Sequence, residues 1–408
     1  MDLFTVMRRQ EVATLLESEF LKWQQEQEWV SIEDALGRVL AADLVSEENI
    51  PPFRRSTVDG YAVRAADTTG CSDSLPAFLQ MLGETRMGQG TDLEVQAEQA
   101  VYVPTGGIVP RGADAVCMIE YTENFQNEIA IQRPMSQLEN LVEIGDDVSI
   151  GECVLQKGSR IQTQHIGAVA ALGRNRVLVK KRIRVAILST GDELIGPGKP
   201  LKLGQIRDSN TDALRAMVIA LGCEVVIADR ILDQFDALQS GLQKAISESD
   251  LVLISGGSSV GTLDMTPDII NSLGKPGILV HGIAIKPGKP TMVAKVQNKA
   301  VFGLPGHPAS CLIAYKTIVE PFIQKTLLAE RIKSFPLTAV ADFQIHVSSG
   351  RDVFYMVQIQ ENEGRWIAKP VHGKSGMVSL LSKADGYIEI PMEKEGIQRG
   401  EIVSVHRF

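Results

Sequence analysis

The fold is decided by residues 182–231, which read RIRVAILSTGDELIGPGKPLKLGQIRDSNTDALRAMVIALGCEVVIADRI. The apolar run at 182–190 predicts a buried strand, residues 209–222 predict a capped helix, and residues 223–231 predict a second strand. The alternation continues, with further strands expected at 250–257 and 299–305 and further helices at 234–249, 266–274 and 308–329. Strands that alternate with helices of about ten or more residues predict a mostly parallel sheet covered on both faces. We therefore predict a doubly wound α/β domain at residues 181–330, with ligands at the carboxyl ends of its strands.

The rest of the chain predicts three other regions. Residues 51–146 consist of short alternating runs between Gly, Pro and Asn, which predicts a β-rich inserted domain. Residues 331–408 again contain strand patterns and predict a separate C-terminal β domain. Residues 1–50 and 147–180 then form a discontinuous mixed N-terminal domain. In it we expect two helices before residue 46, the second starting at Ser31, and another helix from 162 to 172. The predicted fold class is thus multidomain α/β plus β.

Composition excludes several classes of protein. The chain of 408 residues carries a net charge of −9, which disfavours general binding to nucleic acid. No apolar run approaches the ~20 residues that a membrane span needs, and the start of the chain is not a signal peptide. We therefore expect a cytoplasmic protein without membrane contact. The five cysteines form no C-x-x-C pair and the six histidines no H-E-x-x-H, which argues against a disulfide framework and against a zinc site.

Polar clusters follow the predicted strands of the α/β domain. The motifs are STGDEL at 189–194, ISGGSSVGTLD at 254–264 and GLPGHPAS at 303–310. They present Thr190, Asp192 and Glu193; Gly256, Gly257, Ser258 and Asp264; and Ser310. Backbone amides at such positions can bind an anion. Each cluster alone has a plainer interpretation as a turn, a solvated loop or a helix entry. Their coincidence at one edge of the sheet is what favours a ligand site.

The segment GIAIKPGKPTMV, residues 282–293, places Lys286 and Lys289 three positions apart, each followed by a proline. Proline fixes φ and removes an amide donor, so the two cations lie on a stiff backbone. A surface turn would also explain the pattern. The functional alternative is a preformed anion site, because a stiff backbone reduces the entropy lost on ordering the lysines. His307 in the neighbouring motif is expected to be a packed or hydrogen-bonded loop residue, not a metal ligand.

Six motifs in order carry a resemblance to a known family. They are PPFRRSTVDGYAVRAAD, PTGGIVPRGADAV, STGDEL, SGGSSVGTLD, IKPGKP and GLPGHPAS. Together they closely resemble the molybdopterin molybdenumtransferases, the MoeA family, which includes the E domain of gephyrin. The resemblance covers almost the whole chain. It implies an elongated homodimer with four domains per subunit, one of them discontinuous. It also implies an active cleft between the α/β domain of one subunit and the β-rich domain of the other.

The implied reaction is the Mg²⁺-dependent insertion of molybdate into adenylylated molybdopterin, with release of AMP and the molybdenum cofactor. The resemblance implies that adenylylated molybdopterin and molybdate are the substrates. It also suggests contact with the molybdopterin adenylyltransferase. A divalent ion that bridges phosphate oxygens takes carboxylate and water ligands, which gives the acids of the motifs a role.

The site residues implied by the resemblance fall into two sets. The acids expected to be catalytic and to bind the metal are Asp59, Glu193, Asp233 and Asp264. The residues expected to bind substrate are Thr105, Asp147, Thr190, Asp192, Gly256, Gly257, Ser258, Lys286, Lys289, Ser310, Arg351 and Ser375. Within the second set, Lys286, Lys289 and Ser310 resemble the molybdate-binding group, which Arg351 and Ser375 would complete from the last domain.

The sequence leaves three different functions open besides molybdate insertion. The chain could be a tungstate-preferring paralogue that performs the same reaction, or a pterin-binding scaffold without catalysis. The third possibility is an amidohydrolase of the nicotinamide-nucleotide class, which carries a similar α/β module. The DGYAV segment, residues 59–63, and the final β domain argue against the amidohydrolase.

Overall fold

The structure, a computed structural model, describes residues 6–256, 265–348 and 350–408. The chain forms two compact units. The large unit comprises Met1–Ala41, Gly158–Gln162 and Val177–Phe408, and the small unit comprises Ala42–Lys157 and Thr163–Arg176. Among the described residues, no helix has both the length and the apolar character that a membrane crossing requires.

The large unit is built around a six-stranded sheet in the order β16-β13-β17-β21-β20-β18. Its strands are β13 (Arg184–Thr190), β16 (Glu224–Ile231), β17 (Leu251–Ser255), β18 (Pro276–His281), β20 (Met292–Val296) and β21 (Lys299–Leu304). The first four in the spatial order are parallel, whereas β20 is antiparallel to both of its neighbours. A short pair, β14 (Leu194–Ile195) and β15 (Ile206–Arg207), extends from the end of β13.

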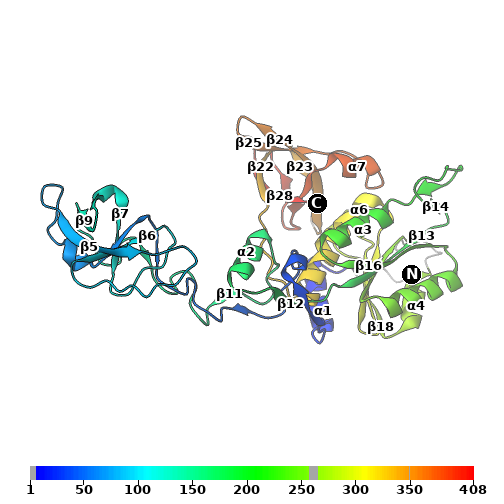
Figure 1. Cartoon of the computed structure of the whole chain (residues 1–408). Coiled ribbons are helices and arrows are strands. Elements are labelled where there is room, and N and C mark those ends of the chain that lie inside the picture. Colours follow the sequence, from blue (N-terminus) through cyan, green and yellow to red (C-terminus); the bar gives the residue numbers. More distant parts are fainter. Residues whose placement is uncertain (1–5, 257–264, 349) are drawn as a thin grey trace. The chain divides into compact units, whose positions relative to one another are not determined.

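Helices cover both faces of this sheet. They are α3 (Asn210–Ala220), α4 (Phe235–Glu248), α5 (Thr266–Leu273) and α6 (Pro308–Ala314), and α6 continues into the π-helical turns Tyr315–Val319 and Phe322–Leu327. Alternate residues of β13 face opposite cores: Ile187 packs in the cluster with α3 and α6, and Leu188 packs in the cluster with α4 and α5. Figure 1 shows α3 and α6 on one side of the sheet and α4 on the other. The predicted doubly wound α/β domain is therefore confirmed.

The C-terminal part of the large unit is a closed β-barrel. Its sheet has the order β19-β24-β25-β22-β28-β26, and β26 also pairs with β24. The strands are β19 (Ile285–Lys286), β22 (Leu337–Ala341), β24 (Asp352–Asn362), β25 (Arg365–Pro370), β26 (Gly386–Ile390) and β28 (Ile402–Arg407). The pair β23 (Ile345–His346) and β27 (Gly396–Ile397) and the helix α7 (Val378–Lys383) complete this part.

The barrel and the α/β sheet are joined into one body. Strand β19 belongs to the α/β segment of the chain yet pairs in parallel with β24 of the barrel. Phe354 and Met356 of β24 are buried in the same apolar cluster as Phe302 of the α/β sheet. A shared core of this kind fixes the position of one part against the other, because buried apolar area is lost if they separate. A pocket between them is therefore preformed.

The N-terminal segment differs from the prediction. It contains the helix α1 (Arg9–Glu19) and the strand pair β1 (Gln27–Ser31) and β12 (Arg176–Lys180). The second helix expected from Ser31 is wrong. The Ser31 hydroxyl does accept a hydrogen bond from the Asp34 amide, at 3.3 Å, but the turn that it caps is only a 3₁₀ turn. That turn ends at Asp34, Gly37 at φ 75° lies in the turn that follows, and Leu40 then pairs with Val179. Strand pairing within the unit overrides the local capping signal.

The small unit is mainly β-structure, as predicted. Its main sheet has the order β7-β4-β6-β5-β9-β8. The strands are β4 (Gly60–Val63), β5 (Ala77–Glu84), β6 (Gln99–Val103), β7 (Ala115–Met118), β8 (Thr122–Phe125) and β9 (Glu128–Ile131). Short pairs join β2 (Leu44–Val45) to β11 (Cys153–Leu155) and β3 (Arg55–Ser56) to β10 (Leu141–Val142). The helix α2 (Thr163–Ala171) ends just before Gly173, at φ 69°, which confirms the predicted helix.

Candidate functional site

The acids after β13 and β16 lie together at the carboxyl edge of the sheet. The Thr190 hydroxyl donates a hydrogen bond to the Asp233 carboxylate, and the Asp233 amide donates to Asp192 Oδ1 at 3.1 Å. The Glu193 carboxylate folds back over Gly191, where an added Cβ would lie 2.8 Å from Glu193 Oε2. Of the sequence-predicted residues, Thr190, Asp192, Glu193 and Asp233 are thus brought together. We call these four residues the acidic edge.

The loop after β17 is only partly described. Gly256 has φ 95°, and a Cβ there would lie 2.4 Å from the Thr190 carbonyl oxygen. A glycine is therefore required where β17 passes the acidic edge. The other predicted residues of this loop, Gly257, Ser258 and Asp264, lie outside the described residues.

A buried polar network beside the acidic edge was missed by sequence reasoning. Asp208 Oδ1 accepts hydrogen bonds from the amides of Asn210 and Thr211, each at 3.1 Å. Asn210 Nδ2 donates to Ser255 Oγ at 2.7 Å and to the Gly306 carbonyl at 2.8 Å. The network therefore ties the start of α3 to the ends of β17 and β21. The run DSNTD, residues 208–212, contains the capping residues that could have indicated it.

A pocket of about 630 Å³ lies between the α/β sheet and the barrel. Its lining includes all five residues that the resemblance assigned to the oxyanion. Lys286, Lys289 and Ser310 come from the α/β segment, and Arg351 and Ser375 come from the barrel part. These residues lie up to some ninety positions apart in the sequence, and the β19–β24 pairing and the shared core bring them to one cavity. The structure thus assembles the predicted oxyanion group within one cavity.

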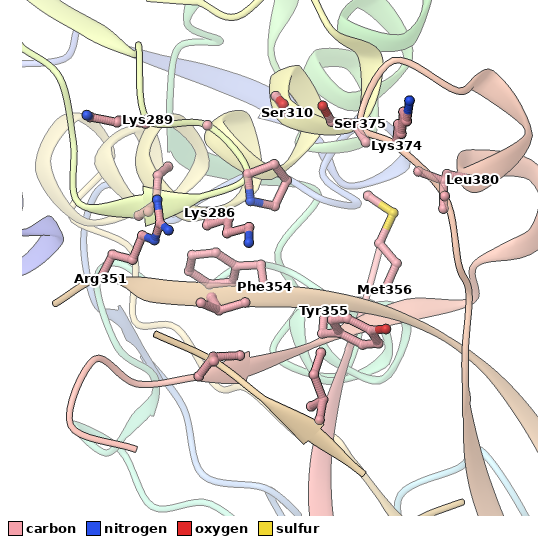
Figure 2. Close-up of a pocket in the computed structure, with 18 of the residues that line it drawn as sticks. Lys286, Lys289, Ser310, Arg351, Phe354, Tyr355, Met356, Lys374, Ser375 and Leu380 are labelled. Atoms are coloured by element: carbon pink, nitrogen blue, oxygen red, sulfur yellow. The ribbon is translucent and has the colours of Figure 1, made fainter. Parts of the chain in front are cut away.

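The side chains of the pocket are arranged unequally (Figure 2). The Lys286 side chain extends over β24, the strand that carries Phe354, Tyr355 and Met356. Ser310 and Ser375 lie next to each other on the opposite side of the pocket, whereas the Lys289 side chain extends away from both serines. The two lysines therefore do not point at one spot, as a two-pronged clamp would require. Lys286 is the better placed of the pair to reach an anion beside the serines.

The electrostatic character of the pocket is positive. Lys286, Lys289, Arg351 and Lys374 all line it, and among the residues that the structure describes no acid lines it. Within the described ranges, none of these four cations takes part in an ion pair. The acid next to Arg351 is occupied elsewhere, because Asp352 Oδ2 accepts from Arg9 Nε at 3.0 Å. In a chain with net charge −9, four uncompensated cations around one cavity favour an anionic ligand.

The lysine segment is held rigid by its own backbone. The Thr291 hydroxyl donates to the Gly288 carbonyl at 2.6 Å, and the Ile283 amide donates to the Lys289 carbonyl at 2.9 Å. Gly288 has φ 119°, and a Cβ there would lie 2.8 Å from Ile285 Cδ1. The positive φ and the close approach both require glycine. Lys286 therefore projects from a closed turn whose shape the sequence indicated through its prolines.

Several pocket residues were missed by sequence reasoning. His346 and Ser348 line the pocket from the segment after β22, and Lys374 lines it from the loop before α7. Tyr355 lies on the floor, and its hydroxyl is 3.4 Å from His372 Nδ1. Burial raises the pKa of Tyr355, so that its hydroxyl stays protonated and able to donate. No local motif marks these residues, because the strand pairing of the barrel alone brings them to the cavity.

His307 is a hydrogen-bonded loop residue, as the sequence predicted. It immediately precedes α6, and its Nδ1 lies 3.1 Å from Ser375 Oγ. The backbone of the same serine is also engaged, since the Ala309 amide donates to the Ser375 carbonyl at 3.1 Å. Two contacts therefore connect the loop of Ser310 with the loop of Ser375.

The remaining predicted residues lie in the small unit. Asp59 precedes β4 and Thr105 follows β6, and the Thr105 amide donates to Asp59 Oδ1 at 2.9 Å. These two residues are therefore adjacent in the small unit. Asp147 lies elsewhere in this unit, where its amide donates to the Ile50 carbonyl at 3.0 Å.

These acids supply only part of the ligands that a magnesium ion needs. Within 6–256, 265–348 and 350–408, no group of three or more His, Cys, Asp or Glu side chains is arranged to hold a metal. Of the expected ligands, Glu193 and Asp233 belong to the acidic edge, Asp59 to the small unit, and Asp264 lies outside the described residues. Mg²⁺ commonly takes one or two carboxylates and completes its shell with water and substrate phosphate. The acidic edge fits that mode.

Comparisons with known proteins cover the chain from end to end. Family models match at residues 7–173 (MoeA N-terminal region, domains I and II), 186–325 (probable molybdopterin binding domain) and 338–408 (MoeA C-terminal region, domain IV). The molybdopterin molybdenumtransferase of Bacillus subtilis is 33% identical over 387 residues, 94% of this chain and 90% of that protein. The protein of the same name from Haemophilus influenzae is 33% identical over 394 residues, 96% of each chain.

Solved structures agree with the sequence comparisons. A crystal structure of the molybdopterin biosynthesis MoeA protein from Pyrococcus horikoshii superposes with a TM-score of 0.86, at 31% identity, and covers 99% of this chain and 100% of that chain. A second structure of the MoeA protein from that organism gives a TM-score of 0.83, at 35% identity and 99% coverage of both chains. The chain therefore belongs to the MoeA family of molybdopterin molybdenumtransferases.

Proposed function

We propose that this protein inserts molybdate into adenylylated molybdopterin and releases AMP together with the molybdenum cofactor. The observation that carries the proposal is the cationic pocket, which gathers Lys286, Ser310, Arg351 and Ser375 in a chain that matches the family over its whole length. Molybdate is a tetrahedral dianion, and compact cations with several hydroxyl donors are suited to it.

The size of the pocket supports an organic substrate beside the oxyanion. A volume of about 630 Å³ is in the range of sites that hold small organic molecules, and one oxyanion would not fill it. Phe354, Tyr355 and Met356 give the floor an apolar character opposite the serines. We infer that the oxyanion occupies the serine side and that part of the pterin substrate lies over the floor.

The acidic edge is proposed to act on the adenylyl group. Glu193 and Asp233 would hold Mg²⁺, and the ion would neutralise the phosphate as the adenylyl link is cleaved. Asp192 accepts a hydrogen bond from the Asp233 amide, and Thr190 donates to the Asp233 carboxylate, so both residues hold Asp233 in place. Asp59 and Asp264 are proposed as further acids of this reaction, with Thr105 and Asp147 as substrate contacts. A homodimer and contact with the adenylyltransferase, which rest on the resemblance, complete the proposal together with a cytoplasmic location.

The test is an AMP-release assay with purified protein, adenylylated molybdopterin, Mg²⁺ and molybdate. We expect AMP release that depends on molybdate and that falls by a few orders of magnitude in Glu193→Gln and Asp233→Asn, because lost charge stabilisation in the transition state costs that much. Absence of AMP release, with intact binding of the pterin, would instead indicate the non-catalytic scaffold.

Two further measurements distinguish molybdate insertion from tungstate insertion and from amide hydrolysis. Replacing molybdate by tungstate tests the oxyanion preference, and a faster rate with tungstate would identify the tungstate-preferring paralogue. Release of ammonia from a nicotinamide mononucleotide substrate would indicate the amidohydrolase. We expect none, because the matching family models include the N-terminal and C-terminal regions of MoeA and not the α/β module alone.

A further inference from the structure

His307 occupies the junction between the two halves of the cationic pocket. It lies three positions before Ser310, and its Nδ1 is 3.1 Å from Ser375 Oγ. The imidazole also packs against the loop of Ser375, since an added Cβ on Gly376 would lie 3.4 Å from His307 Cδ2. Both serines line the pocket and lie next to each other (Figure 2).

The contact with His307 decides what Ser375 can offer an anion. A serine hydroxyl has one proton to donate and lone pairs to accept with. If Nδ1 carries a proton, the imidazole donates to Ser375 Oγ, and the hydroxyl proton is free to point at an oxyanion. If Nδ1 is bare, the hydroxyl must donate to the imidazole, and Ser375 then presents only lone pairs to the pocket. An anion beside Ser375 favours the first arrangement, because the lone pairs would repel it.

We propose that His307 is a positioning residue that donates from Nδ1 to Ser375 and thereby turns the serine hydroxyl towards the bound oxyanion. The inference deepens the proposed function and rests on it for the nature of the ligand. His307 itself need not touch the anion. Its role is to supply a hydrogen-bond donor on the side of Ser375 that faces away from the anion.

A purely structural role for the imidazole is poorly supported by the contacts. The Ala309 amide already donates to the Ser375 carbonyl at 3.1 Å, so the two loops are joined without the His307 side chain. His307 is also exposed, and its ring adds little to the buried core. The hydrogen bond to the hydroxyl is therefore the contact that the backbone does not duplicate.

The position of the donor nitrogen in each side chain gives a set of variants that tests the contact directly. In asparagine the amide nitrogen is bonded to Cγ, as Nδ1 is in histidine, so His307→Asn keeps a donor at the same position. In glutamine the amide lies one bond farther out, and leucine has no donor at all. His307→Gln and His307→Leu therefore remove the contact, and His307→Asn preserves it.

The experiment is titration of each variant with sodium molybdate by isothermal calorimetry, at constant pH and ionic strength. We expect His307→Gln and His307→Leu to bind molybdate roughly tenfold more weakly than the unchanged protein, and His307→Asn to bind within about twofold, because a hydrogen bond to a charged group is at stake. In a Ser375→Ala background, His307→Leu should cause no further loss. If His307→Leu weakened binding by changing the fold slightly, the loss would persist in the Ser375→Ala background, so this comparison separates the two causes.

Different results would overturn different statements. Equal affinities of the His307→Leu and unchanged proteins would refute the positioning role, as would a His307→Asn variant as weak as His307→Leu. Lys286→Met is the reference variant for the site. If it weakens binding while His307→Leu does not, only the role of His307 fails. If molybdate binds Lys286→Met as tightly as the unchanged protein, the proposed oxyanion site itself fails.

Discussion

Replacing Lys286 by methionine tests whether its charge holds the oxyanion. Methionine keeps an unbranched apolar stem of similar length, so the change removes the cation and leaves the packing over β24 nearly intact. The Lys286 side chain is exposed, so water screens its charge. Two unit charges 4 Å apart in water attract by about 1 kcal/mol, and a dianion doubles this to about 2 kcal/mol. We therefore expect the Kd for molybdate to rise roughly thirtyfold.

Lys289→Met is the matched control, because it removes the same charge from the same turn. The side chain of Lys289 extends away from Ser310 and Ser375, so its charge lies farther from the proposed oxyanion (Figure 2). Coulomb energy falls with distance, and at about 10 Å in water it is about 0.8 kcal/mol for a dianion. We expect a loss of about threefold to fourfold for this variant.

The assay is calorimetric titration with molybdate at low salt and again at about 0.5 M salt, where screening shortens the range of surface electrostatics. The loss in Lys286→Met should shrink at high salt, and the smaller loss in Lys289→Met should almost vanish. Two outcomes would refute the reasoning. One is a Kd for Lys286→Met within threefold of the unchanged protein, and the other is a Lys289→Met variant that loses more than Lys286→Met.

Three stability predictions follow from the large unit, each measured by chemical unfolding followed by circular dichroism. Gly288→Ala should destabilise by about 1–3 kcal/mol, because alanine is strained at this backbone conformation, and an unchanged midpoint would contradict this. Tyr315→Phe should be neutral or stabilising, because the Tyr315 hydroxyl is buried without a partner within the described ranges. Burial also raises the pKa of this hydroxyl. A clear loss of stability would reveal a missed hydrogen bond. Arg160→Ala should cost about 3–5 kcal/mol, because it leaves the carboxylate of Glu330, which is 6% exposed, buried without its cation. The exposed pair of Arg399 is the control, and Arg399→Ala should cost less than about 1 kcal/mol.

The α/β domain was predictable because its signals are local. Strands such as β13 are continuous apolar runs, and the helices between them begin and end within a few residues of the predicted bounds. The helix expected from Ser31 failed for the opposite reason. Its capping signal is local, but residues 39 and 40 find strand partners more than a hundred positions away. A pattern in one segment cannot reveal that competition.

The two parts of the candidate site were predictable from the sequence to different extents. Thr190, Asp192 and Glu193 follow directly from the end of a strand, whereas Asp233 was predicted only through the resemblance, and β16 brings it to them. In the cationic pocket, only Lys286, Lys289 and Ser310 are marked by motifs of the α/β segment. Arg351 and Ser375 depended on the resemblance, and His346 and Lys374 were not found at all. The barrel strands place these residues, and a single sequence does not determine which loops of a barrel meet.

The direction of the two lysines shows where a correct motif still leads to an incomplete picture. The prolines of residues 286–290 predicted a stiff turn, and the turn is indeed closed by hydrogen bonds from Thr291 and Ile283. Stiffness fixes the backbone but does not decide where each side chain points. Lys286 follows the pairing of β19 with β24 and extends over the barrel strand, while Lys289, after Gly288, leaves the turn on another side. The second prong of the anion site is therefore better sought in Arg351, which lies beside Lys286 only because the barrel packs against the sheet.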